Sequence, residues 1–141
     1  MKIFAVIDTN ILVSALLSSK NDSATVKVME KVLQKKIIPV YSEEIFTEYK
    51  NILHRKKFNF SAEIVDYLLS AIKSFGILVN PAETEIILPD MKDLPFYKII
   101  LENEDYYLVT GNLKHFPQSD RIITAREMIN LLENIRNKFT R

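Results

Sequence analysis

Cysteine is absent from this chain of 141 residues. Its absence excludes disulfide bonds, metal sites built on thiolates, and cysteine nucleophiles. A chain without cysteine also suits the reducing interior of a cell, so we expect a cytoplasmic protein.

Long hydrophobic runs are absent as well. No segment approaches the roughly 20 apolar residues that a bilayer-spanning helix needs. The first apolar run, residues 3–7, is interrupted at once by Asp8 and is too short for the apolar region of a signal peptide. We therefore expect no membrane partner.

Glycine and excess charge are both scarce. Gly76 and Gly111 are the only two glycines, so long flexible linkers are not expected. The formal net charge is +1, so any surface that binds nucleic acid has to be local. Hydrophobic residues make up 48% of the chain, enough to bury a core, and the length predicts a single domain over residues 1–141.

Short β-like runs alternate with longer helical segments along the chain. This alternation predicts an α/β protein with a parallel sheet covered by helices. The predicted strands are residues 3–7, 37–41, 77–80, 106–109 and 121–123. The predicted helices are residues 10–19, 24–36, 43–53 and 62–75, one that follows Asp93, and one that begins at Thr124 and fades into a basic tail, 136–141.

The ends of several helices have residues that favour a start or a stop. Ser23, Ser42 and Ser61 stand where an N-cap is expected. Gly76 is predicted to end the helix before it, as glycine commonly does. Asp93 precedes a helix with proline in its first turn, where proline is tolerated.

Two polar clusters follow predicted strands directly, and they contain the first candidate functional residues. Asp8-Thr9-Asn10 follows the first strand, and Thr110-Gly111-Asn112 follows the fourth. In open α/β sheets, functional residues collect beyond the carboxyl ends of the strands. An ionised Asp8 after a buried strand is costly unless a metal ion or the next helix N-terminus compensates its charge.

Further acids are candidates for the same edge. Glu48 lies at the margin of an apolar helix stripe, and Asp93 follows Asp90 just before a helix. Each acid alone also has an ordinary structural interpretation, as a helix cap, a turn residue or a solvated side chain. Their joint pattern is what favours a functional site.

That joint pattern resembles the PIN-domain family of nucleases. The segments that carry the resemblance are Val6-Ile7-Asp8-Thr9-Asn10-Ile11-Leu12-Val13-Ser14, Glu48-Tyr49, Asp90-Met91-Lys92-Asp93-Leu94-Pro95-Phe96 and the stretch 107–117, YLVTGNLKHFP. They occur in family order and at family-like separations over nearly the whole chain. The chain looks closest to the branch that contains toxins of toxin–antitoxin pairs, the VapC-type relatives.

The resemblance implies a three-layer α/β/α fold with a central parallel sheet of four to five strands. It also implies hydrolysis of RNA phosphodiester bonds with one or two Mg²⁺ or Mn²⁺ ions. Asp8, Glu48 and Asp93 match the three principal acids of the family, as catalytic residues and metal ligands. Thr9, Asn10 and Thr110 match polar positions that support the family's site, and Asp90 and Asn112 are further supporting candidates.

Asn112 departs from the family pattern, because many members have a fourth acid there. Its amide still offers a neutral carbonyl oxygen, but the site has less negative charge, which puts a tight second metal site in doubt. Asp90 is a candidate to compensate. Oxygen ligands nevertheless suit Mg²⁺, and a bound divalent ion lowers the pKa of its water and offsets charge on the phosphate.

The sequence gives weaker evidence for the residues that contact RNA than for the catalytic acids. The weak RNA-binding candidates are Arg55, Lys56, Lys57, Lys114 and His115. For any single one of these cations, plain surface solubility is the stronger interpretation. His115 is favoured as structural, with substrate contact as the alternative, and His54 as solvated or in contact with phosphate. Tyr41, Tyr49 and Phe58 are candidates to stack on bases, although the apolar stripe places Tyr49 in the core.

The resemblance also implies partners: a small antitoxin protein and a second copy of the chain, joined through the helices at 24–36 and 42–53. Two competing hypotheses remain. One is a degenerate PIN domain that binds RNA or a partner without cleaving, motivated by Asn112. The other is a receiver-like signalling domain, which is disfavoured because receivers carry paired acids after the first strand and an acid after the third, where this chain has Asn80.

Overall fold

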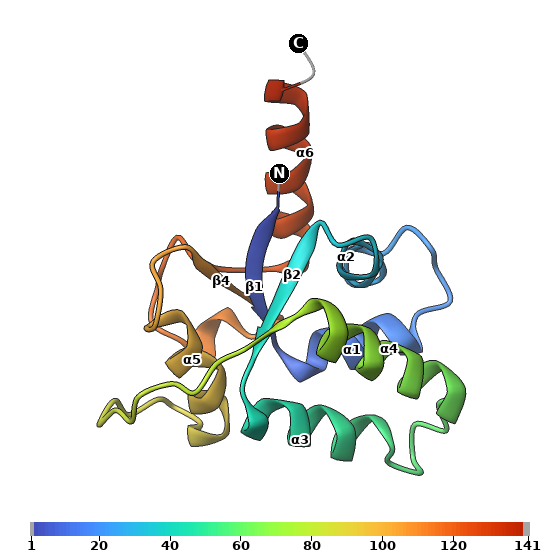
Figure 1. Ribbon diagram of the computed structural model, residues 1–141, viewed down its shortest axis with the longest axis horizontal. Coiled ribbons are helices and arrows are strands. Elements are labelled where there is room, and N and C mark those ends of the chain that lie inside the picture. Colours follow the sequence, from blue (N-terminus) through green and yellow to red (C-terminus); the bar gives the residue numbers. More distant parts are fainter. Residues whose placement is uncertain (1, 140–141) are drawn as a thin grey trace.

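A parallel sheet of five strands forms the centre of the molecule (Figure 1). The computed structural model describes residues 2–139, and the statements that follow concern that part of the chain. The strand order is β3-β2-β1-β4-β5, with every neighbouring pair parallel. The strands are β1 (Ile3–Ile7), β2 (Ile37–Tyr41), β3 (Ile77–Leu78), β4 (Tyr106–Val109) and β5 (Ile122–Ile123).

Six α-helices and two short 3₁₀ helices connect and cover these strands within residues 2–139. The α-helices are α1 (Thr9–Leu17), α2 (Ala24–Leu33), α3 (Glu43–Leu53), α4 (Ala62–Phe75), α5 (Leu94–Ile100) and α6 (Ala125–Phe139). The 3₁₀ helices are η1 (Met91–Asp93) and η2 (Leu113–His115). The predicted α/β class and three-layer α/β/α arrangement are confirmed.

The helices lie on both sides of the sheet. Figure 1 shows α5 on one side of β1 and β2, with α1, α2 and α4 on the other. The order of connections explains this arrangement, because crossovers between parallel strands are right-handed. The chain moves outward from β1 to β3 through α1 to α4, and then returns across the sheet to β4 through α5. Reversing direction with the same handedness puts α5 on the opposite face.

The central strands are apolar because both of their faces are covered. Every residue of β2 is buried, and so are four of the five in β1. The reversal of strand order places β1 and β4 side by side, with Ile7 paired to Val109 at their carboxyl ends. Open α/β sheets bind ligands at such a switch point. The two polar clusters predicted from the sequence follow these two strands.

Several predicted boundaries need correction. The helix predicted over 24–36 ends at Leu33, because Lys35 takes a left-handed backbone conformation with φ of 63°. The third strand is shorter than predicted, since only Ile77 and Leu78 pair with β2. The last helix continues through Phe139 instead of fading at residue 136. Residues 140–141 of the predicted tail lie outside the described part.

Gly76 ends α4 for a different reason from the one predicted. Its φ of −87° and ψ of 176° are extended, so no left-handed cap is present. A Cβ at this position would lie 2.4 Å from the carbonyl oxygen of Ile72 and 2.7 Å from that of Pro39. Glycine is therefore required by the close approach of α4 to β2. Ser42 and Ser23 cap their helices as predicted, whereas Ser61 makes no side-chain cap hydrogen bond.

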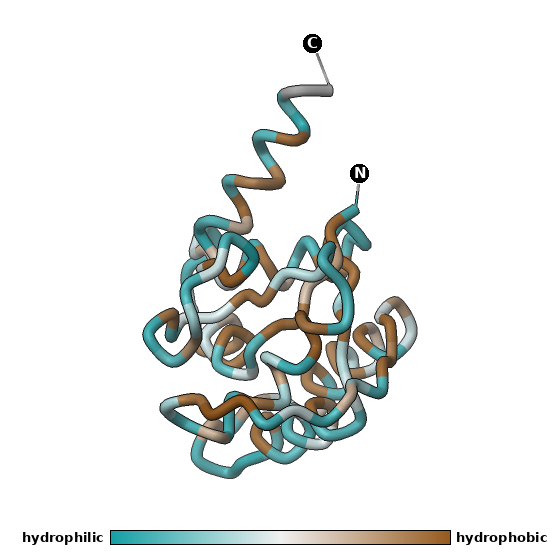
Figure 2. Tube along the Cα trace, turned by 90° about the vertical axis from the view of Figure 1, so that its left-hand side faces the viewer, coloured by the Kyte–Doolittle hydropathy of each residue, from teal (hydrophilic) through white to brown (hydrophobic). Residues whose placement is uncertain are grey.

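Helix α6 extends away from the rest of the fold, with hydrophilic and hydrophobic residues alternating along it (Figure 2). It packs against α2. None of the helices in the described residues has the length and apolar character needed to pass through a bilayer.

Candidate active site

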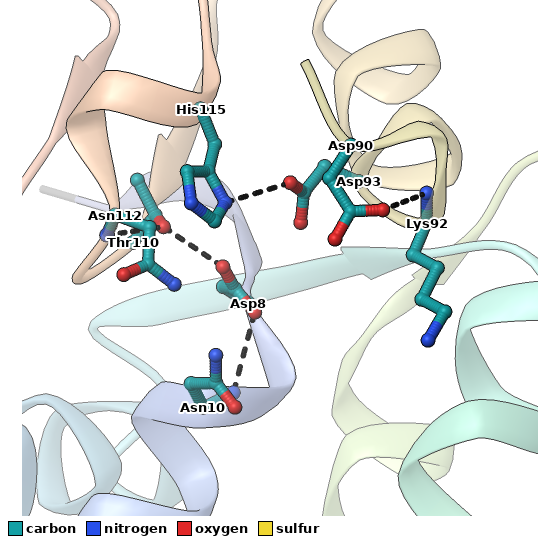
Figure 3. Close-up of polar contacts among 8 residues, drawn as sticks. All are labelled: Asp8, Asn10, Asp90, Lys92, Asp93, Thr110, Asn112 and His115. Atoms are coloured by element: carbon teal, nitrogen blue, oxygen red, sulfur yellow. Dashed lines mark hydrogen bonds and ion pairs between the residues drawn. The ribbon is translucent and has the colours of Figure 1, made fainter. Parts of the chain in front are cut away.

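Asp8 is the central acid of the site, directly beyond the end of β1. Its side chain is nearly inaccessible, with the residue 4% exposed. One carboxylate oxygen accepts the backbone N–H of Asn10 at 3.2 Å, which makes Asp8 the N-cap of α1. The other accepts the hydroxyl of Thr110 at 2.8 Å (Figure 3). The ordinary interpretation as a cap is therefore correct, and it does not exclude a functional one.

The turn after β4 holds Asp8 from the opposite side. Thr110 is fully buried, and its backbone N–H donates to Ile123 on β5 at 2.9 Å. The Thr110 hydroxyl oxygen also accepts the backbone N–H of Asn112 at 3.0 Å. One hydroxyl thus links the two polar clusters predicted from the sequence. Figure 3 shows Asn112 beside Thr110, near Asp8.

Glu48 reaches the same edge from α3, which lies beyond the carboxyl ends of β1 and β2 (Figure 1). Its Oε2 accepts a hydrogen bond from the hydroxyl of Thr9. The next residue, Tyr49, is buried, and its hydroxyl donates to the carbonyl oxygen of Ile7 at the end of β1. Tyr49 thereby fixes α3 against β1 immediately before Asp8. The prediction that Tyr49 belongs to the core is confirmed; Tyr41 is also buried and is not available to stack on a base.

Asp93 lies at the end of η1, and its side chain contacts His115, for which the sequence favours a structural role. Its Oδ2 lies 3.0 Å from Nδ1 of His115, which is on η2 (Figure 3). Asp93 stands at the N-cap position of α5, as predicted, but its side chain makes no cap hydrogen bond. Asp90 caps the preceding helix η1, where its side chain accepts the backbone N–H of Lys92 at 2.9 Å.

The acids influence one another electrostatically. Burial raises the pKa of Glu48, the hydrogen bond from Thr9 opposes this, and the negative charges of Asp8 and Asp93 raise the pKa further. Burial likewise raises the pKa of Asp93; the hydrogen bond with His115 opposes the change, while the charge of Asp8 adds to it. Asp8, Glu48 and Asp93 therefore surround one region in which a positive charge would be stabilised.

The donor chemistry of this region suits a hard divalent cation. All three acids supply oxygen ligands, which Mg²⁺ prefers, and Mg²⁺ commonly keeps several waters when it binds. Within residues 2–139, however, no group of three or more His, Asp or Glu side chains is already arranged to hold a metal ion. The residues fit the ion by charge and ligand type, while direct contact of one ion with all three acids is not preformed.

The predicted RNA-contacting cations divide into two groups. His115 adjoins the acids, because it contacts Asp93 directly, and Lys114 precedes it on η2 with an exposed side chain. The stretch 55–57 is exposed at the end of α3 that lies away from α5 (Figure 1), and the structure does not bring it to the acids. Sequence reasoning placed no weight on Lys98. Lys98 is almost buried. Its position inside the apolar run 94–100 was the signal in the sequence that could have indicated this burial.

A carboxylate-centred site at the switch point of a parallel α/β sheet defines a class of hydrolytic and phosphoryl-transfer proteins that use divalent ions. The sequence profile of the PIN domain matches residues 5–114. The chain belongs to the PIN-domain family, which is generally a nuclease fold whose nucleases use divalent metals. Neither the curated proteins nor the solved structures gave a significant match.

Proposed function

We propose that this protein is a divalent-metal-dependent endoribonuclease with Asp8, Glu48 and Asp93 as its catalytic acids. The main observation in support is that these acids come from three separate segments of the chain and meet at one edge of the sheet, where burial and the negative charge of Asp8 raise the pKa values of both Glu48 and Asp93. Like charges brought together in this way cost stability, and such groups cluster at functional sites, which favours a function for these acids.

Each acid has a neighbour that orients it. Thr110 and the start of α1 hold both oxygens of Asp8. Thr9 holds Oε2 of Glu48, which leaves Oε1 as the atom that accepts a proton from the attacking water. The raised pKa of Glu48 brings this base closer to neutral pH, where proton transfer is most effective. His115 fixes the carboxylate of Asp93.

Mg²⁺ or Mn²⁺, when bound, would supply a more acidic water and offset the negative charge on the phosphate oxygens. Asp8 and Asp93 would hold it, Glu48 would face it as the base or serve as a third ligand, and Asn112 would contribute a neutral amide oxygen nearby. Because Asn112 adds no charge, we expect one firmly held ion rather than two. Asp90 caps η1 and is oriented by that role, so its contribution to the ion is minor.

We further propose that the substrate is single-stranded RNA and that the reaction takes place in the cytoplasm. The VapC-type resemblance supports a toxin role, with a small antitoxin protein as its inhibitor and a homodimer as its assembly. The suggested dimer interface would have to use two separated helices, since α2 packs mainly on α1 and α6 while α3 packs on α1, α4 and α5.

The decisive experiment is cleavage of a mixed single-stranded RNA pool by purified wild type and by Asp8→Asn. Asparagine has the same shape and keeps one oxygen that can cap α1, while its NH₂ group takes the place of the oxygen that accepts the Thr110 hydroxyl, so this variant removes the charge and that one acceptor. Wild type should cleave with Mg²⁺ or Mn²⁺ and not with EDTA, and Asp8→Asn should be at least about 100-fold slower. Asp93→Asn is expected to behave in the same way.

Full activity of either variant, in a preparation free of contaminating nuclease, would remove the proposed mechanism. A second candidate is an RNA-binding module that does not cleave. Two observations favour it: the neutral Asn112, and the lack, within residues 2–139, of a preassembled cluster of three metal-binding side chains. RNA binding without cleavage by wild type under any metal condition would support this second candidate.

A further inference from the structure

A cleft of about 520 Å³ lies between α3 and the η1–α5 segment, and it opens beside the acids. Glu48 belongs both to the acid group and to the wall of this cleft. Its volume falls within the usual range for pockets that hold small ligands or single nucleotides. A strand of RNA with its scissile phosphate at the acids therefore has a recess immediately next to it.

The cleft has two cations, and they differ sharply in their surroundings. Lys92 is exposed at the rim, and Figure 3 shows its side chain extending away from Asp90 and Asp93. The side chain of Lys98 is only 10% exposed, and its Nζ lies 3.2 Å from Oε1 of Glu83. A lysine is almost never buried to this extent without a partner.

The partner of Lys98 is weakly held. The side chain of Glu83 is 91% exposed, and it comes from the irregular segment between β3 and η1. Ion pairs with one partner in water contribute little stability. Glu83 can therefore swing into solvent at small cost, which exposes a positive charge inside the cleft to an incoming anion.

The remaining walls suit a nucleotide. Met91, Leu94 and Pro95 line the cleft with apolar surface against which a base can pack. The acids Glu44 and Glu48 would repel a phosphate there unless a cation compensated their charge, and Lys98 is the buried group that does so.

We propose that this cleft binds the nucleotide adjacent to the scissile phosphate of single-stranded RNA, with Lys98 in contact with its phosphate in place of Glu83. The inference rests on the proposed function, because it takes RNA as the substrate of the neighbouring acids. It adds Lys98, Lys92 and the cleft to the site, and it makes Glu83 a competitor of the substrate.

The test measures binding of a fluorescent single-stranded RNA of 12 nucleotides by anisotropy, with Ca²⁺ replacing Mg²⁺ so that cleavage does not interfere. Lys98→Met keeps the apolar stem of the side chain and should weaken binding about tenfold. It should also reduce the salt dependence by about the 0.7 expected for one lost phosphate contact to a single strand. Glu83→Gln removes the competing charge and should tighten binding about threefold.

Lys50→Met is the matched control, because Lys50 is exposed on α3 and does not line the cleft. It should bind RNA as wild type does. A purely structural ion pair between Lys98 and Glu83 would instead make both cleft variants less stable without moving RNA affinity in opposite directions. Affinity equal to that of wild type in either cleft variant overturns the inference, and thermal unfolding establishes that each variant is folded.

Photocrosslinking locates the nucleotide independently of any variant. RNA carrying 4-thiouridine should crosslink to the peptide that contains residues 91–98, and crosslinks confined to other surfaces overturn the proposal. Cleavage that persists while crosslinks map elsewhere would refute the cleft and leave the nuclease intact. Crosslinking at 91–98 without cleavage by wild type would support the cleft and refute the nuclease.

Discussion

Replacing Thr110 with valine tests whether one buried hydroxyl joins the two halves of the site. Valine has nearly the same shape, so packing is preserved while two hydrogen bonds are lost. These are the bond to Oδ2 of Asp8 at 2.8 Å and the bond from the backbone N–H of Asn112 at 3.0 Å. The first involves a charged acceptor, for which the net contribution is about 1.5–3 kcal/mol.

We expect Thr110→Val to lower the free energy of unfolding by about 2–4 kcal/mol, because Asn112 is partly exposed and water replaces some of the second bond. For a chain of this length, 1 kcal/mol corresponds to about 3–4 °C in the melting temperature, so the expected loss is about 6–16 °C. Calorimetry measures the melting temperature, and urea unfolding monitored by circular dichroism measures the free energy of unfolding. Cleavage should also fall by about tenfold or more, since Asp8 is no longer held from the β4 side.

Thr110→Ser is the matched control because it keeps the hydroxyl and loses one methyl group. It should cost about 1 kcal/mol and leave the activity close to that of wild type. A double-mutant cycle with Asp8→Ala should give a coupling energy of about 1.5–3 kcal/mol between the two side chains. A coupling near zero, or equal stability of the valine and serine variants, would refute the proposed link.

Three further predictions concern charge, metal and the loop after α5. Because the folded state raises the pKa values of Glu48 and Asp93, it binds more protons than the unfolded chain, so the free energy of unfolding of the metal-free protein should decrease as pH rises from about 4. Melting curves of Glu48→Gln/Asp93→Asn should lack that decrease; a persisting slope would assign it to other groups. Mg²⁺ at a hundredfold excess over its Kd should stabilise wild type by about 2.7 kcal/mol and Asp8→Asn by much less, as differential scanning fluorimetry can show. An equal shift in both proteins would place the ion elsewhere. Arg121→Met should cost about 2–4 kcal/mol, because Nη1 of Arg121 donates to the carbonyl oxygens of Ile100, Asn103 and Tyr106 at 2.9, 3.0 and 2.9 Å. Chemical denaturation measures this loss, and a change below 0.5 kcal/mol would mean that water replaces the arginine.

The position of the strands along the chain and their burial could be predicted, because local patterns determine both. The run 3–7 is apolar throughout, as a strand covered on both faces must be, and β1 has the predicted bounds. The polar residues after β1 and β4 were predicted to share an edge, and the bond between Thr110 and Asp8 confirms that they do. Parallel strands necessarily bring their carboxyl ends to the same edge.

Contacts that depend on two distant elements were not predictable in the same way. His115 and Asp93 lie 22 positions apart on two short 3₁₀ helices, and no periodicity relates them. Gly76 is required in part by the close approach of the end of α4 to Pro39, a residue of β2 that lies far away in the sequence. Such pairings follow from the packing of whole elements, which local propensity does not determine.

Asp8 has a consequence for how this family can lose its chemistry. The residue that starts α1 is also the residue at the centre of the acids, and asparagine, serine and threonine start helices almost as well as aspartate. A single substitution by one of these residues therefore removes the carboxylate charge and keeps the helix cap. Alanine would remove the charge and the cap together, and so would destabilise the fold. Inactive descendants of such a protein should accumulate Asn, Ser or Thr at position 8 and should persist as stable binding domains. The residue at this one N-cap position would then distinguish active nucleases from inactive ones among related proteins.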